Sequence, residues 1–455
     1  MTRIRSNKLC ALLACLLLLV GGADAQTTQQ PNIIIIVADD LGWNDVGYNG
    51  SSIKTPHIDQ LARTGIRLDQ HYVLPTCTPT RVGLITGKYP SRYGILGPDY
   101  GEVIYSGDPT LASILARKGY STSIIGKWHM GSPPHTPLTY GFQTSYGSID
   151  GQIEPYTHEY KNGRKSWHRN DVLFDEEGHA TDLITQEAVR AIEQKRAQPY
   201  FLYVTYTTPH TPINEPQEWM ALYEKLNLFP SRQRFAASVS HLDAGLGKIL
   251  AALDRTGQRN NTLILFISDN GGQESLSQET DEKEYHGAYA DKPHQVLGSN
   301  FPLRGWKGEV YEGGIRVPAI VNWPGRLSPG AYEAPLHVVD WLPTLGALTQ
   351  SEQEVARLQL DGQNVWLQLT GQRPAQRSRQ LYWKTGRMSA VRDGDWKLVF
   401  HRTSRQAEVY NLTKDFRESR EVGTEYPEKK AQLLALLQVF EKGDGKRKAA
   451  PSDKE

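Results

Sequence analysis

Asn32-Ile33-Ile34-Ile35-Ile36-Val37 is the stretch of sequence that decides the fold. A continuous β-branched run of this kind is typical of a strand buried on both faces, as in parallel sheets covered by helices. Similar apolar runs recur along the chain, and segments with helical periodicity separate them. The runs are 121–125, 200–206, 263–268 and 319–322, and the helical segments are 110–118, 182–195 and 232–255. This alternation predicts an α/β fold with a large doubly wound, mostly parallel sheet.

The pattern changes after residue 347, where short strand-like segments replace the long apolar runs. They are 380–384, 388–392, 396–400 and 408–411, and a helix is expected over 427–440. Asp393-Gly394-Asp395 between two of them is a strong hairpin signal. We therefore predict a large α/β domain over 26–347 and a smaller C-terminal α+β domain with an antiparallel sheet over 348–441. Residues 442–455 are charged and are predicted to form a disordered tail.

Residues 1–25 have the features of a secretory signal peptide. Arg3, Arg5 and Lys8 precede an apolar stretch over 9–20, and Ala23-Asp24-Ala25 matches an A-x-A cleavage site. The apolar stretch is shorter than the ~20 residues that span a bilayer, so no stable membrane insertion is expected. We predict cleavage after Ala25 and a secreted or periplasmic protein, or a lysosomal one in a eukaryotic host.

The composition excludes some partners and isolates one cysteine. Lysine and arginine number 51 against 50 acidic residues, and this near balance argues against a nucleic-acid binder. Cys10 and Cys15 lie in the predicted signal peptide, so the mature chain keeps only Cys77 and can form no internal disulfide. A single thiol in an exported protein suggests a chemical use.

Carboxylates follow two of the predicted buried strands. Asp39 and Asp40 come directly after the first run, and Asp269-Asn270-Gly271 follows the run at 263–268. Ligands of open α/β sheets bind at the carboxyl ends of the strands, so these oxygens could form a site for Ca²⁺ or Mg²⁺. A set dominated by protein oxygens favours Ca²⁺, because Mg²⁺ tends to keep its waters. The alternative is that each pair is only a turn, since Asp and Asn are common there.

Two long segments, 131–179 and 272–300, are rich in Gly, Pro, His, Tyr and charge and carry no clear periodicity. Long loops inside a compact domain are usually functional, so we expect a specificity pocket there. His286 and His294 are candidate substrate contacts within the second segment.

Two motifs resemble those of a known family. Cys77-Thr78-Pro79-Thr80-Arg81, with its flanks through Gly87, resembles the first signature of the type I sulfatases, where the cysteine is oxidised to formylglycine (3-oxoalanine). The segment from Gly119 to His129, which ends in Gly-Lys-Trp-His, resembles the second signature. Segments 302–308 and 312–316 are similar to the arylsulfatase B-like branch. The implied fold is that of the alkaline phosphatase superfamily.

The resemblance also implies roles for individual residues. Asp39, Asp40, Asp269 and Asn270 would hold one Ca²⁺ together with modified residue 77, Arg81 would stabilise the formylglycine hydrate, Lys127 and Lys307 would hold the sulfate oxygens, and His129 and His210 would move protons. A formylglycine-generating enzyme would be a transient partner. Taken singly, each lysine would more often be a solvated surface charge.

The chemistry of a sulfate ester explains why such residues are needed. Its anionic oxygens repel a nucleophile, and fixed cations offset that repulsion where charge develops. Our hypothesis is that one hydroxyl of the hydrate, activated by the metal and Asp269, attacks sulfur while His210 protonates the departing alcohol. His129 then deprotonates the second hydroxyl and sulfate is expelled, so that covalent catalysis divides one difficult step into two.

The sequence therefore predicts a sulfuric ester hydrolase that removes sulfate from a sulfated carbohydrate and from artificial aryl sulfates. A 4-sulfated galactose or N-acetylgalactosamine unit is the expected substrate. Two alternatives stay open: a phosphonate monoester hydrolase or phosphodiesterase with the same cysteine motif, and a non-catalytic binder of sulfated glycans in which Cys77 stays unmodified.

Overall fold

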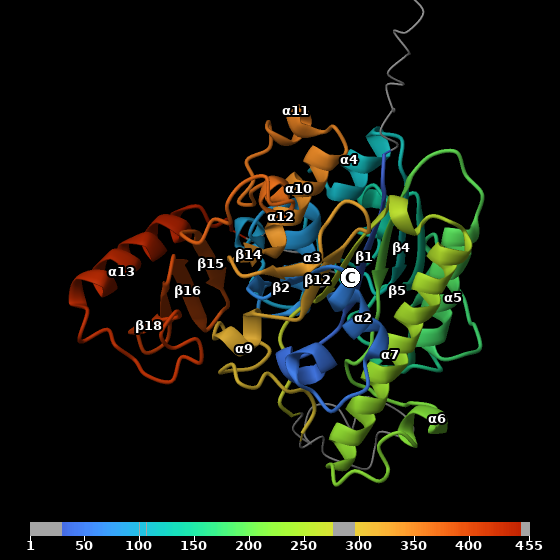
Figure 1. Ribbon diagram of the computed structural model, residues 1–455, viewed down its shortest axis with the longest axis horizontal. Coiled ribbons are helices and arrows are strands. Elements are labelled where there is room, and N and C mark those ends of the chain that lie inside the picture. The colour runs from blue at the N-terminus through green and yellow to red at the C-terminus, as the bar shows by residue number, and fades with distance from the viewer. Residues whose placement is uncertain (1–29, 100, 106, 276–295, 447–455) are drawn as a thin grey trace, which may run out of the picture. The chain divides into compact units, whose positions relative to one another are not determined.

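A computed structural model describes residues 30–99, 101–105, 107–275 and 296–446 (Figure 1). The predicted signal peptide, His286, His294 and residues 447–455 of the predicted tail lie outside the described residues. By their contacts the described residues from Pro31 onward form one compact unit, so the domain boundary at residue 347 stays a prediction.

The centre of the fold is a ten-stranded sheet with the order β13-β2-β12-β11-β1-β10-β4-β5-β8-β9. Its five central strands, from β11 to β5, are parallel. Shorter strands extend both edges: β12 and β8 are antiparallel to their central neighbours, whereas β13 pairs in parallel with β2. Ile35 of β1 lies opposite Tyr203 on one side and Leu265 on the other. The strands are β1 Asn32–Ala38, β2 Ile66–Leu68, β4 Ser121–Gly126, β5 Thr144–Ser148, β8 Trp167–Arg169, β9 Val172–Leu173, β10 Tyr200–Thr205, β11 Thr262–Ser268, β12 Ala319–Asn322 and β13 Gly330–Tyr332.

The two faces of β1 explain its unbroken apolar run. Ile33, Ile35 and Val37 belong to one core, whereas Ile34 and Ile36 belong to the other. Successive side chains of a strand point to opposite faces, so a strand covered on both sides needs an apolar residue at every position. The prediction of a doubly wound α/β sheet is confirmed.

Helices cover both faces of the sheet (Figure 1). One core contains side chains of α2 Pro56–Thr64, α5 Ala180–Glu193 and α7 Pro230–Arg255. The opposite core contains side chains of α3 Cys77–Thr86, α4 Leu111–Arg117 and α10 Trp341–Leu348. Other short elements are α6 Gln217–Met220, α9 Glu312–Ile315, α11 Glu352–Val355 and α12 Trp366–Leu369, with the strand pairs β3 His71–Tyr72 and β14 Leu336–His337, and β6 Glu159–Tyr160 and β7 Arg164–Lys165.

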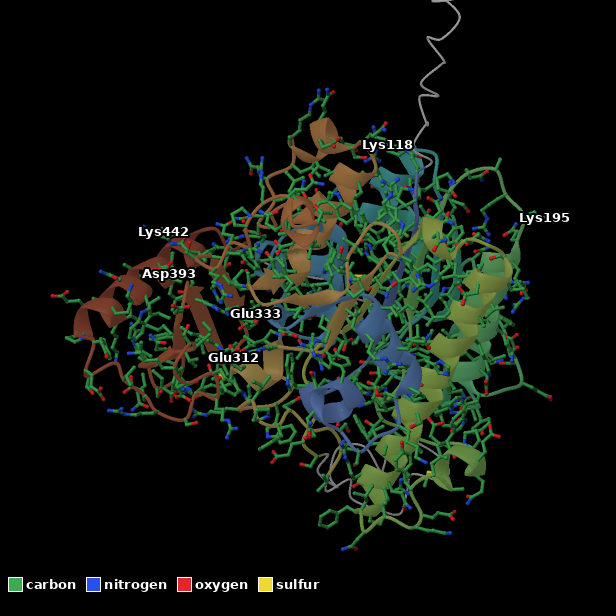
Figure 2. All side chains as sticks on the ribbon, viewed as in Figure 1. Lys118, Lys195, Glu312, Glu333, Asp393 and Lys442 are labelled. Carbon is green, nitrogen blue, oxygen red and sulfur yellow. The ribbon has the colours of Figure 1, made fainter. Side chains whose placement is uncertain are left out.

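The C-terminal part forms a separate four-stranded antiparallel sheet, as predicted. Its elements are β15 Gln380–Lys384, β16 Met388–Asp393, β17 Trp396–His401, β18 Gln406–Asn411 and the helix α13 Pro427–Lys442. Gly394, with a φ of 59°, makes the expected hairpin between β16 and β17. Nζ of the buried Lys397 in this sheet donates to Oε1 of Glu312 in α9 at 2.9 Å. Glu312 is labelled in Figure 2.

Two sequence expectations need correction in detail. Segment 131–179 is not an unstructured loop, because it contains the strands β5 to β9, three of which are only two residues long. Strands this short leave little periodicity to detect. The first residues of the predicted tail contact the C-terminal sheet, because Asp444 accepts hydrogen bonds from Lys384 and Tyr382 at 2.7 and 2.8 Å.

No helix among the described residues is both long and apolar enough to cross a membrane.

Candidate active site

The predicted site residues meet at the carboxyl ends of four neighbouring parallel strands. Asp39 and Asp40 follow β1, Asp269 follows β11, His210 lies in the loop after β10, and Lys127 follows β4. These strands lie side by side in the order β11-β1-β10-β4. Parallel strands end at the same edge of the sheet, so residues far apart in sequence share one place.

Cys77 is the first residue of α3 and is only 2% exposed. Arg81 lies one helical turn later and is fully buried. Its Nη2 donates to Asp269 Oδ2 at 2.8 Å, and its Nη1 donates to the carbonyl oxygen of Lys127 at 3.1 Å. The guanidinium thus joins the ends of two strands to the helix that carries the cysteine.

Two lysines pair with the two aspartates that follow β1. Lys127 Nζ donates to Asp39 Oδ2 at 2.6 Å, and Lys307 Nζ donates to Asp40 Oδ2 at 2.7 Å. The loop of Lys307 reaches the site because the N–H of Gly308 donates to the carbonyl oxygen of Pro75 at 2.7 Å. The second predicted lysine is therefore held close to the start of α3.

The oxygen atoms of this cluster fit a hard cation. Among the described residues, Asp39 Oδ1 and Asn270 Oδ1 are buried and have no hydrogen-bond partner. Asn270 Nδ2 donates to Asp40 Oδ1 at 2.7 Å, which turns its amide oxygen away from that carboxylate. Buried acceptors without partners are costly, and carboxylate and amide oxygens are the ligands that Ca²⁺ and Mg²⁺ prefer. The donor set fits the predicted metal.

Burial and neighbouring charges separate the pKa values of the two aspartates. Burial and the charge of Asp269 raise the pKa of Asp39 to about 8, against the opposing effect of Lys127. Burial would also raise the pKa of Asp40, but Lys307, His210 and the hydrogen bond from Asn270 together outweigh it, and the pKa falls to about 2. Crowded buried carboxylates of this kind disfavour full ionisation unless a cation is near, which again fits a metal site.

The two predicted histidines are neutral near pH 7. Burial and the nearby cations lower the pKa of His129 well below its ordinary value. Burial, followed by the charge of Lys307, lowers the pKa of His210 to about 3. His210 Nδ1 donates to the carbonyl oxygen of Thr211, so its Nε2, which lies 3.7 Å from Asp40 Oδ2, carries the lone pair. Each histidine is therefore neutral and has one ring nitrogen that can accept a proton.

The backbone around His129 is unusual. His129 has a φ of 51° and Asp40 has a φ of 68°, and positive values at such residues mark strain that tends to collect at functional sites. Thr78 Oγ1 donates to the carbonyl oxygen of His129 at 3.0 Å. A Cβ at Gly151 would lie 2.3 Å from the His129 ring, so the glycine makes room for the imidazole. Neither contact was predicted from the sequence. The Asp-Gly pair at 150–151 is a common turn sequence and does not by itself indicate a neighbour of His129.

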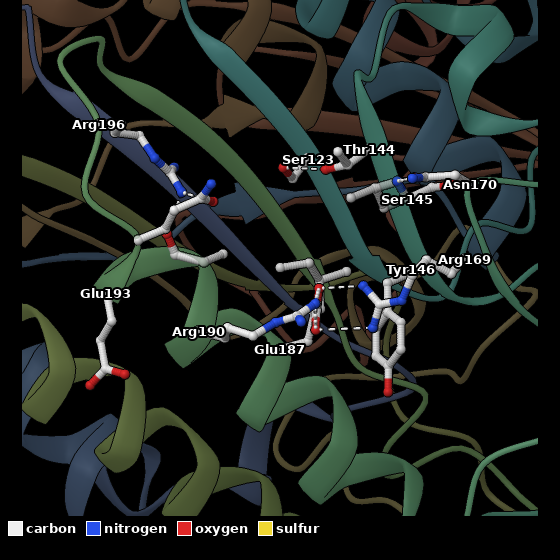
Figure 3. Close-up of a pocket in the computed structure, with 14 residues that line it drawn as sticks. Ser123, Thr144, Ser145, Tyr146, Arg169, Asn170, Glu187, Arg190, Glu193 and Arg196 are labelled. Carbon is white, nitrogen blue, oxygen red and sulfur yellow. Dashed lines mark hydrogen bonds and ion pairs between the residues drawn. The ribbon is translucent and has the colours of Figure 1, made fainter.

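A separate groove lies between β4, β5 and the C-terminal part of α5 (Figure 3). Its volume is about 550 Å³, and no predicted site residue lines it. Two of its arginines, Arg169 and Arg190, both pair with Glu187, as the dashed lines for Arg169 show in Figure 3. Glu187 offsets only part of the charge of the two arginines, and the groove contributes no residue to the predicted site.

Comparison with known proteins identifies the family. A sequence model described as "Sulfatase" matches residues 31–351. The chain belongs to the sulfatase family. The resemblance seen in the two motifs is thereby confirmed, and this sulfatase is a sulfuric ester hydrolase.

Individual relatives span most of this sulfatase. It is 31% identical to arylsulfatase J of Mus musculus, over 91% of this chain and 76% of that protein. It is 32% identical to N-acetylgalactosamine-6-sulfatase of Mus musculus, over 71% of this chain and 62% of that protein. The crystal structure of Ps i-CgsB in complex with k-i-k-neocarrahexaose superposes with a TM-score of 0.80 at 29% identity, covering 92% of this chain and 94% of that one.

Proposed function

We propose that this sulfatase removes sulfate from a sulfated saccharide with a formylglycine formed from Cys77 and one bound Ca²⁺. The observation that carries the proposal is the setting of Cys77 on α3. The charges that act on the residue come from Lys127, Lys307, Asp269 and Asp39. Cys77 thus lies where cationic groups and oxygens that suit a metal ion converge.

An unmodified thiol would be a poor nucleophile in this setting. Burial raises the pKa of Cys77 despite the opposing charges of the two lysines, so the group stays protonated at neutral pH. The thiolate is the reactive form of cysteine, and the surroundings disfavour it. A hydrated aldehyde at position 77 would supply an oxygen nucleophile and would release sulfate when the aldehyde forms again. Oxidation by a formylglycine-generating enzyme would create that group.

Asp39, Asp40, Asp269 and Asn270 would hold the Ca²⁺. When bound, the ion would neutralise charge on the ester and lower the pKa of a hydroxyl beside it. Lys127 and Lys307 are paired with Asp39 and Asp40 in the structure. With the ion on these carboxylates, the two ammonium groups become available to hold the sulfate oxygens.

The histidines divide the proton transfers. The negative charge of a bound ester offsets the repulsion that Lys307 exerts on His210, so the pKa of His210 rises and it gains the proton that it gives to the departing alcohol. His129 is neutral and buried, as a base requires, and accepts the proton of the second hydroxyl when sulfate leaves. Arg81, fixed by Asp269, stabilises the hydrate.

The names of two relatives support a substrate class. One relative is named for N-acetylgalactosamine 6-sulfate, and another was crystallised with k-i-k-neocarrahexaose. We infer that a sulfated galactose or N-acetylgalactosamine unit is the substrate here, with the 4-sulfate and the 6-sulfate as the two positions to compare. We also infer export of the mature chain, directed by residues 1–25.

Mass spectrometry of the tryptic peptide 68–81 tests the nucleophile, with protein made alongside a formylglycine-generating enzyme. We expect an aldehyde at residue 77 and turnover of a galactosamine sulfate. Turnover of a phosphodiester in preference to any sulfate ester would favour a phosphodiesterase. An unmodified thiol, with the maturation enzyme active on a control substrate, would favour a non-catalytic glycan binder.

A further inference from the structure

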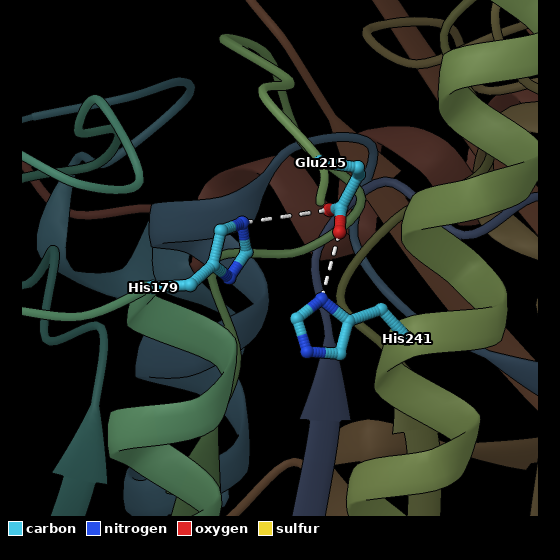
Figure 4. Close-up of side chains that lie close together, drawn as sticks. All are labelled: His179, Glu215 and His241. Carbon is cyan, nitrogen blue, oxygen red and sulfur yellow. Dashed lines mark hydrogen bonds and ion pairs between the residues drawn. The ribbon is translucent and has the colours of Figure 1, made fainter. Parts of the chain in front are cut away.

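Three buried side chains gather beside the loop that carries His210. His179 precedes α5, His241 lies on α7, and Glu215 lies between them in the loop after β10 (Figure 4). Their ligand atoms lie within 4.8 Å of one another, so the group has the composition of a metal site. None of the three is among the residues predicted to form the site.

The hydrogen bonds of His241 make it a cation. Its Nδ1 lies 2.7 Å from Glu215 Oε2, and its Nε2 lies 3.3 Å from Asp182 Oδ2. Carboxylate oxygens only accept, so both ring nitrogens donate and the ring is an imidazolium. Burial opposes this charge, but the two carboxylates outweigh it and raise the pKa of His241 to about 9. Lys248 also contacts Asp182, at 3.1 Å on the exposed side.

The tautomer of His179 argues against a bound metal. The N–H of Thr181 donates to His179 Nδ1 at 3.2 Å, as a cap of α5. Nδ1 therefore carries the lone pair, and Nε2, which faces Glu215 Oε1 at 3.8 Å, carries the proton. With both nitrogens of His241 also protonated, only Glu215 offers a lone pair to a cation. The group of His179, Glu215 and His241 is therefore held together by ion pairing, and we call it the clamp.

The clamp holds a segment that contains His210. Glu215 lies five residues after His210 in the chain, and the ring of Trp219 stacks on His241 with centroids 5.0 Å apart. Thr208 is tied to Thr181 by a hydroxyl contact of 2.6 Å on the other side of His210. His241 thus contacts the chain at two points after His210, namely Glu215 and Trp219.

A small cavity connects the clamp to the site. His179, Glu215 and His210 all line it. The Glu215 side chain is only 1% exposed, so without the imidazolium its carboxylate would be buried and uncompensated. The loop would then move to bring that charge to water, and His210 would move with it.

We propose that His241 is a positioning residue of this sulfatase: by gripping Glu215 and Trp219 it holds the loop, and with it His210, at the carboxyl end of the sheet. The proposal rests on the proposed function, in which His210 protonates the leaving alcohol. His241 itself touches neither the substrate nor the nucleophile.

The experiment compares two leaving groups. A sugar alcohol needs a proton to depart, whereas nitrophenolate leaves without one, so loss of a well-placed His210 affects the two substrates unequally. In His241→Gln we expect kcat on a galactosamine sulfate to fall roughly 10- to 100-fold, because a 1 Å displacement can cost that much. On nitrophenyl sulfate we expect less than a threefold change. In a His210→Ala background, His241→Gln should cause no further loss.

Asp243→Asn is the matched control on the same helix. Asp243 is buried and accepts from the N–H groups of His57 and Ile58, away from the loop. Any change in kcat that Asp243→Asn causes should be equal for the two substrates. Asp182→Asn, at a half-exposed position, is the second variant if His241→Gln does not fold, and it should reproduce the unequal loss in weaker form.

Several outcomes would overturn the proposal. Equal losses on both substrates, or a further loss in the His210→Ala background, would make the role of His241 purely structural. A second metal ion per wild-type chain, absent from His241→Gln, would make the group a metal site. If the wild type with aldehyde at residue 77 hydrolysed no sulfate ester, the proposed function would fail and the inference with it. If instead His210→Ala showed the unequal loss and His241→Gln did not, the inference alone would fail.

Discussion

Replacing Gly151 by alanine tests whether the position of the His129 ring matters. The new Cβ would lie 2.3 Å from His129 Cε1 and 2.4 Å from its Nε2. Non-bonded carbon atoms settle at about 3.5–4.0 Å, so the ring must move by about 1 Å or more. Overpacking of this kind costs ~1–3 kcal/mol of stability. A displaced catalytic base can cost roughly 100-fold in rate, equal to ~2.7 kcal/mol.

The assay measures kcat on a sugar sulfate well below the unfolding temperature, beside the urea-induced unfolding of the same protein. Gly386→Ala is the control, because nothing lies within 4 Å of its added Cβ. We expect kcat to fall about 100-fold for Gly151→Ala, by the same displacement argument, and to stay unchanged for the control. A Gly151→Ala enzyme with wild-type kcat would refute the assigned position or role of His129.

Three further predictions concern stability. Lys397 bridges Glu312 and Glu418 at 2.9 and 2.8 Å with all three side chains fully buried, so Lys397→Met should lower the free energy of unfolding by ~3–5 kcal/mol. A change below about 1 kcal/mol in urea unfolding would contradict these pairs. The pKa of His241 is raised from 6.5 to about 9, because the two carboxylates outweigh burial. Its stabilising effect is therefore complete below pH 6.5 and is lost as the pH rises through about 9, so the Tm difference between wild type and His241→Gln should shrink over that range. Chelation with EDTA should lower the Tm of the wild type, since an ion at 100 times its Kd adds ~2.7 kcal/mol. Asn270→Ala should reduce that shift, and an undiminished shift would exclude Asn270 as a ligand.

Local patterns were enough to place the main strands and the chemistry at their ends. The run at β1 is apolar at every position because both of its faces are buried, and that requirement can be read directly from the residues. Asp39 and Asp269 follow their strands immediately, so the shared edge of a parallel sheet was predictable. The cysteine motif around Cys77 is equally local. The strands of segment 131–179 were missed because β6 to β9 are only two or three residues long and β5, Thr-Ser-Tyr-Gly-Ser, has no apolar run.

The strand order was not available from such patterns. β10 lies between β1 and β4 although more than 70 residues separate it from either one in sequence. The strands β1, β10 and β11 carry similar apolar runs, so these runs do not show which strands are neighbours. The order depends on how the helices between the strands pack on the two faces.

The sequence by itself determined that this chain is an α/β protein with a sulfatase cysteine motif and acidic residues at its strand ends, because each of these features is written within a few neighbouring residues. Only the tertiary structure decided which lysine pairs with which aspartate, that Gly151 makes room for His129, and that His241 on a distant helix grips the loop of His210. Charge, pKa and side-chain position depend on distance and burial in space, and these are set only when remote segments pack together.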